Sequence, residues 1–205
     1  MNDVLVGAIL VLGLGVVVVR RRSAALGLVA LQSLALGIGA LDLASERSSE
    51  FVVASGVLLA KAAVLPALLL VVMRRTPEAR LVAPAAPALA RLAGAGGVAL
   101  VAAALVPPLG LGDAQTEQTA VALVLVGIAI VVARRPTFLQ LLGLIVAENG
   151  LSLLAVSVPG GLPYVIEIGA LFDLMLVVTV AAAFTQRIHA ELGTGDSELL
   201  RSLRD

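Results

Sequence analysis

Four ionisable residues interrupt long apolar stretches of the chain: Lys61, Glu148, Glu167 and Asp173. Placing one such group near the centre of a lipid bilayer costs at least about 2.5–3.5 kcal/mol. Burial raises the pKa of a carboxyl group and a nearby cation lowers it, so a carboxyl group under both influences can exchange a proton near neutral pH. We therefore predict that these residues face other helices, a water-filled path or a partner subunit, and that they form a proton relay.

Glu148 has polar neighbours at helical spacing. Gln140, Glu148 and Ser152 fall on one stripe of a helix, and Asn149 lies beside them. These supporting side chains would give the carboxyl group hydrogen-bonding partners inside an apolar segment. The pattern favours a relay residue at Glu148, and the alternative is a structural glutamate that bonds to another helix.

Lys61 and Asp173 lie near the middle of their apolar runs. A lysine and an aspartate that pair are less costly in a membrane than either charge alone. We predict that they form a charge pair, either within the chain or across an interface with another chain. Glu167 precedes Asp173 by six residues, which places it about 120° away around the helix.

The composition requires a membrane environment around these charges. Of 205 residues, 60% are apolar and 14% are charged, whereas soluble domains carry about 25% charged residues. A spanning helix needs about 20 mostly apolar residues. The sequence predicts an all-α, polytopic membrane protein whose seven transmembrane helices occupy residues 3–19, 24–41, 51–73, 92–111, 116–133, 138–158 and 162–184.

Other kinds of chemistry lack the residues that they need. Cysteine is absent, and the single histidine, His189, lies among the charges of the C-terminal tail. No P-loop, dinucleotide-binding or HExxH motif is present, and a net charge of zero argues against a nucleic-acid partner. We predict no catalytic residue, metal ligand or cofactor in this chain. The GAGG segment at 94–97 is predicted to serve close helix packing.

Arginine residues divide unequally between the two sides of the predicted membrane. Only Arg47 lies on one side, and the other side has the remainder, which are Arg20, Arg21, Arg22, Arg74, Arg75, Arg80, Arg91, Arg134, Arg135, Arg187, Arg201 and Arg204. Cytoplasmic loops carry an excess of positive charge. This distribution predicts a multi-pass protein of the inner (plasma) membrane with its N-terminus outside and its C-terminus in the cytoplasm.

An internal repeat is also predicted. LGLVALQSLALGIGAL, from Leu26, resembles LGLIVAENGLSLLAV, from Leu142, at an offset of 116 residues, which makes Gln32 the equivalent of Glu148. We expect a parallel repeat of three plus three helices joined by a fourth; the alternative is chance similarity between Leu/Ala/Gly-rich helices. The expected organisation is an N-terminal three-helix unit (1–75), a cytoplasmic loop (76–91), a connecting helix (92–115), a C-terminal three-helix unit (116–185) and a cytoplasmic tail (186–205).

The block LQLLGLIVAENGLSLLAVSVPGGLPYVIEIGALFDL, at 139–174, resembles hydrogenase-4 component E. The resemblance rests on an AENG glutamate in mid-helix, a short Pro/Gly loop and the pattern LPxxIEIGxxxD. That family is related to the K subunit of complex I and to the C subunit of Mrp-type antiporters. The resemblance, over about residues 134–186, implies that Glu148 matches the family's membrane glutamate and that Glu167 and Asp173 match its last-helix acidic positions. Lys61 and Gln32 are predicted from depth and repeat position alone.

The resemblance implies a non-catalytic subunit of a complex-I-like, membrane-bound hydrogenase. Its expected partners are antiporter-like membrane subunits and a hydrogenase-like module, and its role would be to help couple redox chemistry to proton or sodium translocation. Iron–sulfur and nickel–iron centres would belong to those partners, because this chain has no cysteine. The alternatives are a stand-alone, ion-coupled secondary transporter and a non-conducting scaffold subunit.

Overall fold

The computed structural model describes residues 2–44, 49–75, 87–105, 107, 110, 113–134, 136–158, 175 and 177–179. Six helices lie within these segments, and no strand does. They are α1 (Asp3–Val18), α2 (Arg22–Ala44), α3 (Ser49–Arg75), α4 (Ala88–Leu105), α5 (Ala114–Ala133) and α6 (Thr137–Ser157). The described part of the chain is therefore all-helical, as the composition predicted.

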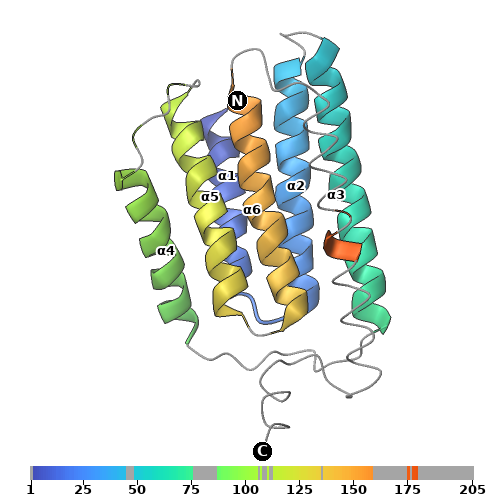
Figure 1. Ribbon diagram of the computed structural model, residues 1–205, viewed down its shortest axis with the longest axis vertical. Coiled ribbons are helices and arrows are strands. Elements are labelled where there is room, and N and C mark those ends of the chain that lie inside the picture. The colour runs from blue at the N-terminus through green and yellow to red at the C-terminus, as the bar shows by residue number, and fades with distance from the viewer. Residues whose placement is uncertain are drawn as a thin grey trace, which may run out of the picture.

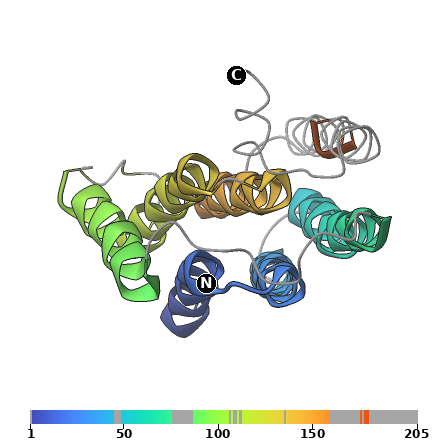
Figure 2. The same cartoon turned by 90° about the horizontal axis from the view of Figure 1, so that it is seen from below.

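The six helices form an up-and-down bundle in which consecutive helices run in opposite directions (Figure 1). Viewed along the helix axes, α1 and α2 lie on one side of the α5–α6 pair (Figure 2). Helices α4 and α3 flank the bundle at opposite ends of the same view. This arrangement brings α2, α3 and α6 together, and these helices carry Gln32, Ser33, Lys61, Glu148 and Asn149.

Four of these helices are long and apolar enough to cross a membrane. The candidate spans are Arg22–Asp42, Ser55–Arg74, Ala114–Ala133 and Thr137–Ser157, and α1 and α4 contribute shorter apolar segments. A helix can cross a bilayer because its backbone groups are all hydrogen-bonded within the helix. Of the seventh predicted helix, residues 162–184, only four residues are described, and these are helical.

The predicted connecting helix needs correction. We expected residues 92–111 to be helical and residues 76–91 to be a loop, whereas α4 begins at Ala88 and ends at Leu105. Pro107 and Pro108 follow that end, and proline has no N–H for a helical hydrogen bond and restricts the residue before it. Gly110, with φ of +71°, adopts a left-handed conformation that only glycine reaches easily. The apolar run therefore continues past the end of the helix.

Helix α5 begins with a side-chain cap. The carboxylate of Asp113 accepts hydrogen bonds from the backbone N–H of Thr116 at 2.9 Å and from its hydroxyl at 2.8 Å. These bonds favour the charged form and lower the pKa of Asp113. The cap satisfies backbone donors that the first turn of a helix leaves unpaired, which fixes where α5 starts.

Helices α5 and α6 pack with almost no space between their backbones. A methyl group built on Gly127 would lie 2.6 Å from the carbonyl oxygen of Gly143, and one on Gly150 would lie 2.8 Å from the carbonyl oxygen of Ala120. Small residues permit such close approach between apolar helices. This contact fixes the position of α6, which carries Glu148.

The glycines of the GAGG segment do not make such a contact. A methyl group on Gly94, Gly96 or Gly97 would meet no atom of the described residues within 4 Å. The prediction that this segment serves close helix packing is therefore wrong for the described part of the chain. Gly94 and Gly97, which share one face of α4, leave that face without side chains, and we call these two positions the glycine strip.

Candidate functional site

A buried ion pair joins α3 to α6. The ammonium group of Lys61 donates a hydrogen bond to Oε2 of Glu148. The side chain of Lys61 is 2% exposed and that of Glu148 is 16% exposed. The two charges come from the middle of apolar helices, so each lowers the cost of burying the other.

Ser152 links both members of the pair. Its hydroxyl donates to Oε1 of Glu148 at 3.0 Å and accepts from Nζ of Lys61 at 3.3 Å. Ser152 lies one helical turn after Glu148 on α6, as the predicted stripe requires. Lys61, Glu148 and Ser152 therefore form one polar cluster in an apolar surrounding, which we call the ion-pair site.

A second polar cluster lies on the other side of α6. The side-chain amide of Asn149 donates to Oε1 of Gln32 at 3.1 Å and to the hydroxyl of Ser33 at 2.9 Å. Gln32 in turn donates to the backbone carbonyl of Ile9 at 2.9 Å. These three side chains are at most 3% exposed, and they form what we call the amide cluster, which ties α1, α2 and α6 together.

The amide cluster contains a contact between positions that the proposed repeat makes equivalent. The hydroxyl of Ser33 lies 3.2 Å from Oδ1 of Asn149, and the two residues are separated by 116 positions. Sequence reasoning proposed Gln32 and Asn149 as supporting residues but missed Ser33. The signal was present in the same offset, because Ser33 and Asn149 occupy equivalent places in the two similar stretches, each one residue after the Gln32 and Glu148 pair.

Gln140 does not support Glu148. Its side-chain amide donates to the backbone carbonyl of Arg134 at 2.8 Å, just beyond the end of α5. It therefore caps the α5–α6 connection, although it shares the helical stripe of Glu148. Both residues lie on one face of α6, but they are eight residues apart along the helix, so their side chains contact different parts of the protein.

Arginine side chains hold the C-terminal end of α1. Arg91 donates to the carbonyl oxygens of Val17 at 3.0 Å and of Val18 at 3.2 Å. Arg134 donates to the carbonyl oxygens of Val17 and, at 3.1 Å, of Val19. The last carbonyl groups of a helix lack partners within it and carry partial negative charge, so guanidinium groups stabilise them.

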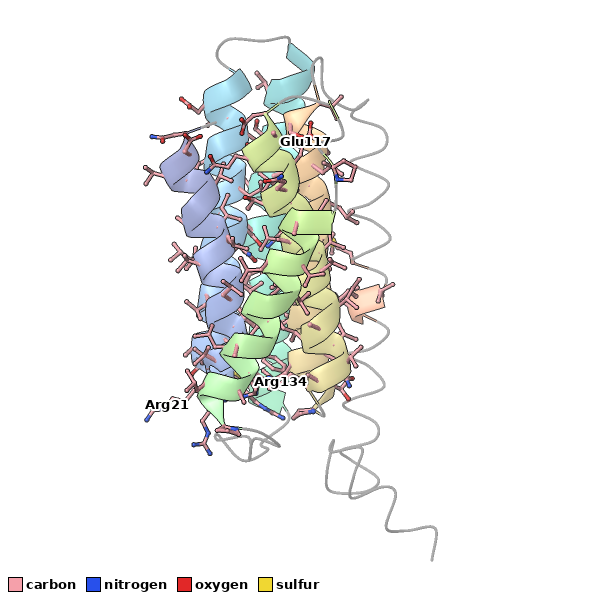
Figure 3. All side chains as sticks on the ribbon, turned by 90° about the vertical axis from the view of Figure 1, so that its left-hand side faces the viewer. Arg21, Glu117 and Arg134 are labelled. Atoms are coloured by element: carbon pink, nitrogen blue, oxygen red, sulfur yellow. The ribbon has the colours of Figure 1, made fainter. Side chains whose placement is uncertain are left out.

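A further buried carboxylate lies at the other end of the bundle. Glu117, in the first turn of α5, is 2% exposed, and Figure 3 shows it at the opposite end of the bundle from Arg21 and Arg134. Its sequence context, AQTEQTA, is polar and indicates a solvated helix start. Nothing in that pattern distinguishes a buried glutamate from an exposed one.

Two predicted relay residues, Glu167 and Asp173, lie outside the described residues, so the predicted pair between Lys61 and Asp173 stays a prediction. Among the described residues, no group of three or more His, Cys, Asp or Glu side chains could hold a metal ion.

Replacing Ser33 with alanine is expected to destabilise the bundle by about 1 kcal/mol, because both contacts between its hydroxyl and the Asn149 side chain are lost while Asn149 keeps its bond to Gln32. The free energy of unfolding in detergent micelles measures this effect. Ser157→Ala is the matched control, since among the described residues the Ser157 hydroxyl bonds only to the carbonyl of Leu154 in its own helix. Equal losses in the two variants would contradict a stabilising role for the amide cluster.

The fold and this site define an all-helical protein with helices suited to a membrane and a charge pair buried between two of them. Over 86 residues the chain is 31% identical to the uncharacterized protein Rv0085 of Mycobacterium tuberculosis. That match covers 42% of this chain and 39% of the relative, so the chain spans about two fifths of the curated protein that it matches. No family model matches the chain, and no solved structure gives a significant match.

Proposed function

We propose that this chain is an integral membrane-arm subunit of a complex-I-like, membrane-bound hydrogenase, and that it contributes buried ionisable residues to proton or sodium translocation. The observation that carries the proposal is the ion pair between Lys61 and Glu148. Ionisable residues inside a membrane are rare and costly, and they mark ion pathways and proton relays. Glu148 also lies in the block that resembles hydrogenase-4 component E.

The ion pair has the properties of a switch. Protonation of Glu148 would neutralise the carboxylate and leave the ammonium group of Lys61 without its countercharge, which is costly at this depth. Deprotonation would restore the pair. Glu148 is the more exposed partner and Lys61 is almost fully enclosed, so we assign proton exchange to Glu148 and the role of fixed countercharge to Lys61. Ser152 holds the carboxylate in place through its second oxygen.

The finer topology belongs to the same proposal. Seven spans and a parallel three-plus-three repeat would place Glu167 and Asp173 in a last helix, where they would extend the relay. The contact between Ser33 and Asn149 supports the repeat, because equivalent residues meet where two related units face each other. The arginine-rich end of the bundle would face the cytoplasm by the positive-inside rule.

The proposed partners are antiporter-like membrane subunits and a hydrogenase-like module. A chain without cysteine cannot ligate iron–sulfur or nickel–iron centres through thiolates. The redox centres would therefore lie in other subunits, and this chain would transmit the effect of electron transfer to ion movement through its buried charges.

Replacing Glu148 with glutamine is expected to reduce redox-driven ion uptake into membrane vesicles at least about tenfold, because the exchangeable proton site is lost. Uptake is followed with a pH-sensitive or sodium-sensitive dye while the assembled complex turns over. The control is Asp113→Asn, which also removes a carboxylate but keeps a side chain that caps α5. Full coupling in the assembled Glu148→Gln complex would refute the relay role.

Assembly must be separated from coupling in this experiment, because Glu148→Gln leaves Lys61 without its partner. The double variant Lys61→Met/Glu148→Gln removes both charges and is expected to copurify with its partners while coupling stays low. If the double variant assembles but no longer drives ion uptake, the result favours a relay role for this chain over a role as a non-conducting scaffold. Transport by the purified chain alone in liposomes would instead favour a stand-alone transporter.

A further inference from the structure

Positive charge gathers at one end of the bundle, which we call the arginine end: the end of α1, the start of α2, the start of α4 and the end of α5. Arg91 and Arg134 both donate to the carbonyl oxygen of Val17, so their guanidinium groups lie close together. Arg20 is exposed and lies near enough to Arg91 for the two charges to repel each other. Three cations therefore converge where α1 meets α4.

This convergence is electrostatically unfavourable without an anion. Burial and the positive charge of Arg91 lower the pKa of Arg134 to about 10, which still leaves it protonated at neutral pH. The Nε atom of Arg91 is buried and has no hydrogen-bond partner among the described residues. The carbonyl groups of α1 supply only partial negative charge.

The acidic residues of the described helices cannot supply the missing charge. Asp3, Asp42, Glu50, Asp113 and Glu117 lie at the opposite ends of their helices, as the directions of α1, α2, α3 and α5 require, and Glu148 is paired with Lys61. Among the described residues, no carboxylate therefore lies at the arginine end; the acidic residues of segments 76–86 and 180–205 lie outside the described residues.

The surface beside Arg91 suits a lipid. Leu89 and Leu92, in the same turn of α4, are exposed. Gly94 lies one turn further on the same face as Arg91, and it begins the open glycine strip of α4. A charged group at the helix end, followed by a glycine face that is exposed at Gly94 and half-buried at Gly97, matches the layout of a phospholipid, whose headgroup lies about 15 Å from the bilayer centre and whose acyl chains extend inward.

We propose that the arginine end binds the phosphate group of an anionic phospholipid through Arg20 and Arg91, with an acyl chain lying along the glycine strip of α4. Guanidinium groups bind phosphate oxygens with charge-assisted hydrogen bonds. Arg20 is exposed and would supply most of these bonds, whereas Arg91, which already donates to the carbonyl groups of Val17 and Val18, would contribute its charge and its remaining N–H groups. Basic pockets between helices at the cytoplasmic side of a membrane bind such headgroups. Arg134 is a positioning residue that raises the local positive potential from within the bundle. This site does not depend on the proposed ion translocation.

The test measures binding of phosphatidylglycerol to the full chain in a neutral detergent, by native mass spectrometry and by the shift in Tm. Phosphatidylglycerol is expected to bind at least about tenfold more tightly than phosphatidylcholine and to raise the Tm. Inorganic phosphate at the same concentration is expected to have little effect, because it lacks the acyl chain. Equal binding of the two lipids, or an equal effect of inorganic phosphate, would overturn the proposal.

Two substitutions with the same loss of charge locate the site. Arg20→Gln is expected to weaken phosphatidylglycerol binding at least about fivefold without altering the fold, because Arg20 is exposed. Arg21→Gln is the control, since Figure 3 shows Arg21 directed away from the bundle. Equal weakening in the two variants would indicate a diffuse charge effect and would refute a defined headgroup site.

Discussion

Replacing Lys61 with methionine is expected to lower the free energy of unfolding by about 3–5 kcal/mol, because the substitution leaves a buried carboxylate without its cation. Methionine matches the unbranched shape of the lysine side chain and fits an enclosed position. Lys61 is 2% exposed, so water cannot replace the lost charge at that point. Equilibrium unfolding in detergent micelles, at neutral pH, measures the loss.

Adding the Glu148→Gln substitution to this variant is expected to recover most of the lost stability. A neutral amide at position 148 needs no cation, and Ser152 remains beside it as a hydrogen-bonding partner. The cycle of single and double variants separates the interaction between the two charges from the cost of each substitution. Additive losses, with no recovery in the double variant, would contradict a direct ion pair.

The positions of the helices could be predicted because the bilayer imposes one rule on every span. Each backbone polar group in an apolar medium must be hydrogen-bonded within its own helix, so a long apolar run predicts a helix regardless of its neighbours. The runs 3–19 and 116–133 differ from α1 and α5 by only a residue or two at each end. The error at α4 arose because hydropathy registers the apolar side chains around Pro107 and not the missing proline N–H.

The partners of the buried charges could not be predicted in the same way. Periodicity fixes which face of α6 carries Glu148, but the rotation of α3 against α6 depends on side-chain packing between residues far apart in the sequence. The sequence therefore suggested Asp173 for Lys61, by analogy between repeat positions, and the described residues contain Glu148 as its partner. The same limit explains why Gln140 was assigned to Glu148 although it bonds to Arg134.

Gly127 lies at the backbone contact between α5 and α6 that positions α6. Gly127→Ala is expected to destabilise the bundle by about 1–3 kcal/mol, because the added methyl group would lie 2.6 Å from the carbonyl oxygen of Gly143 and 2.7 Å from Cα of Ala147. Backbone atoms cannot move aside as a flexible side chain can, so α5 and α6 must separate. The measurement is again the free energy of unfolding in micelles.

Gly56→Ala is the matched control, since a methyl group on Gly56 of α3 would meet no atom of the described residues within 4 Å. Alanine favours a helix over glycine by about 1 kcal/mol, so this control should become slightly more stable while Gly127→Ala becomes less stable. If the same glycine-to-alanine change raises the stability at position 56 and lowers it at position 127, the loss at 127 comes from the α5–α6 contact and not from helix propensity. If the two variants respond alike, the close approach at Gly127 does not hold the bundle together.

The same pair of variants connects packing to the ion-pair site. Ala147, whose Cα lies against Gly127, immediately precedes Glu148, so displacement of α6 at Ala147 must move the carboxylate relative to Lys61 on α3. Gly127→Ala should therefore make the Lys61→Met substitution less costly, because the ion pair is already weakened. Gly56→Ala, which leaves α6 in place, should not change that cost. A difference between the two backgrounds would show that glycine packing at one face of α6 holds the charge pair together at another.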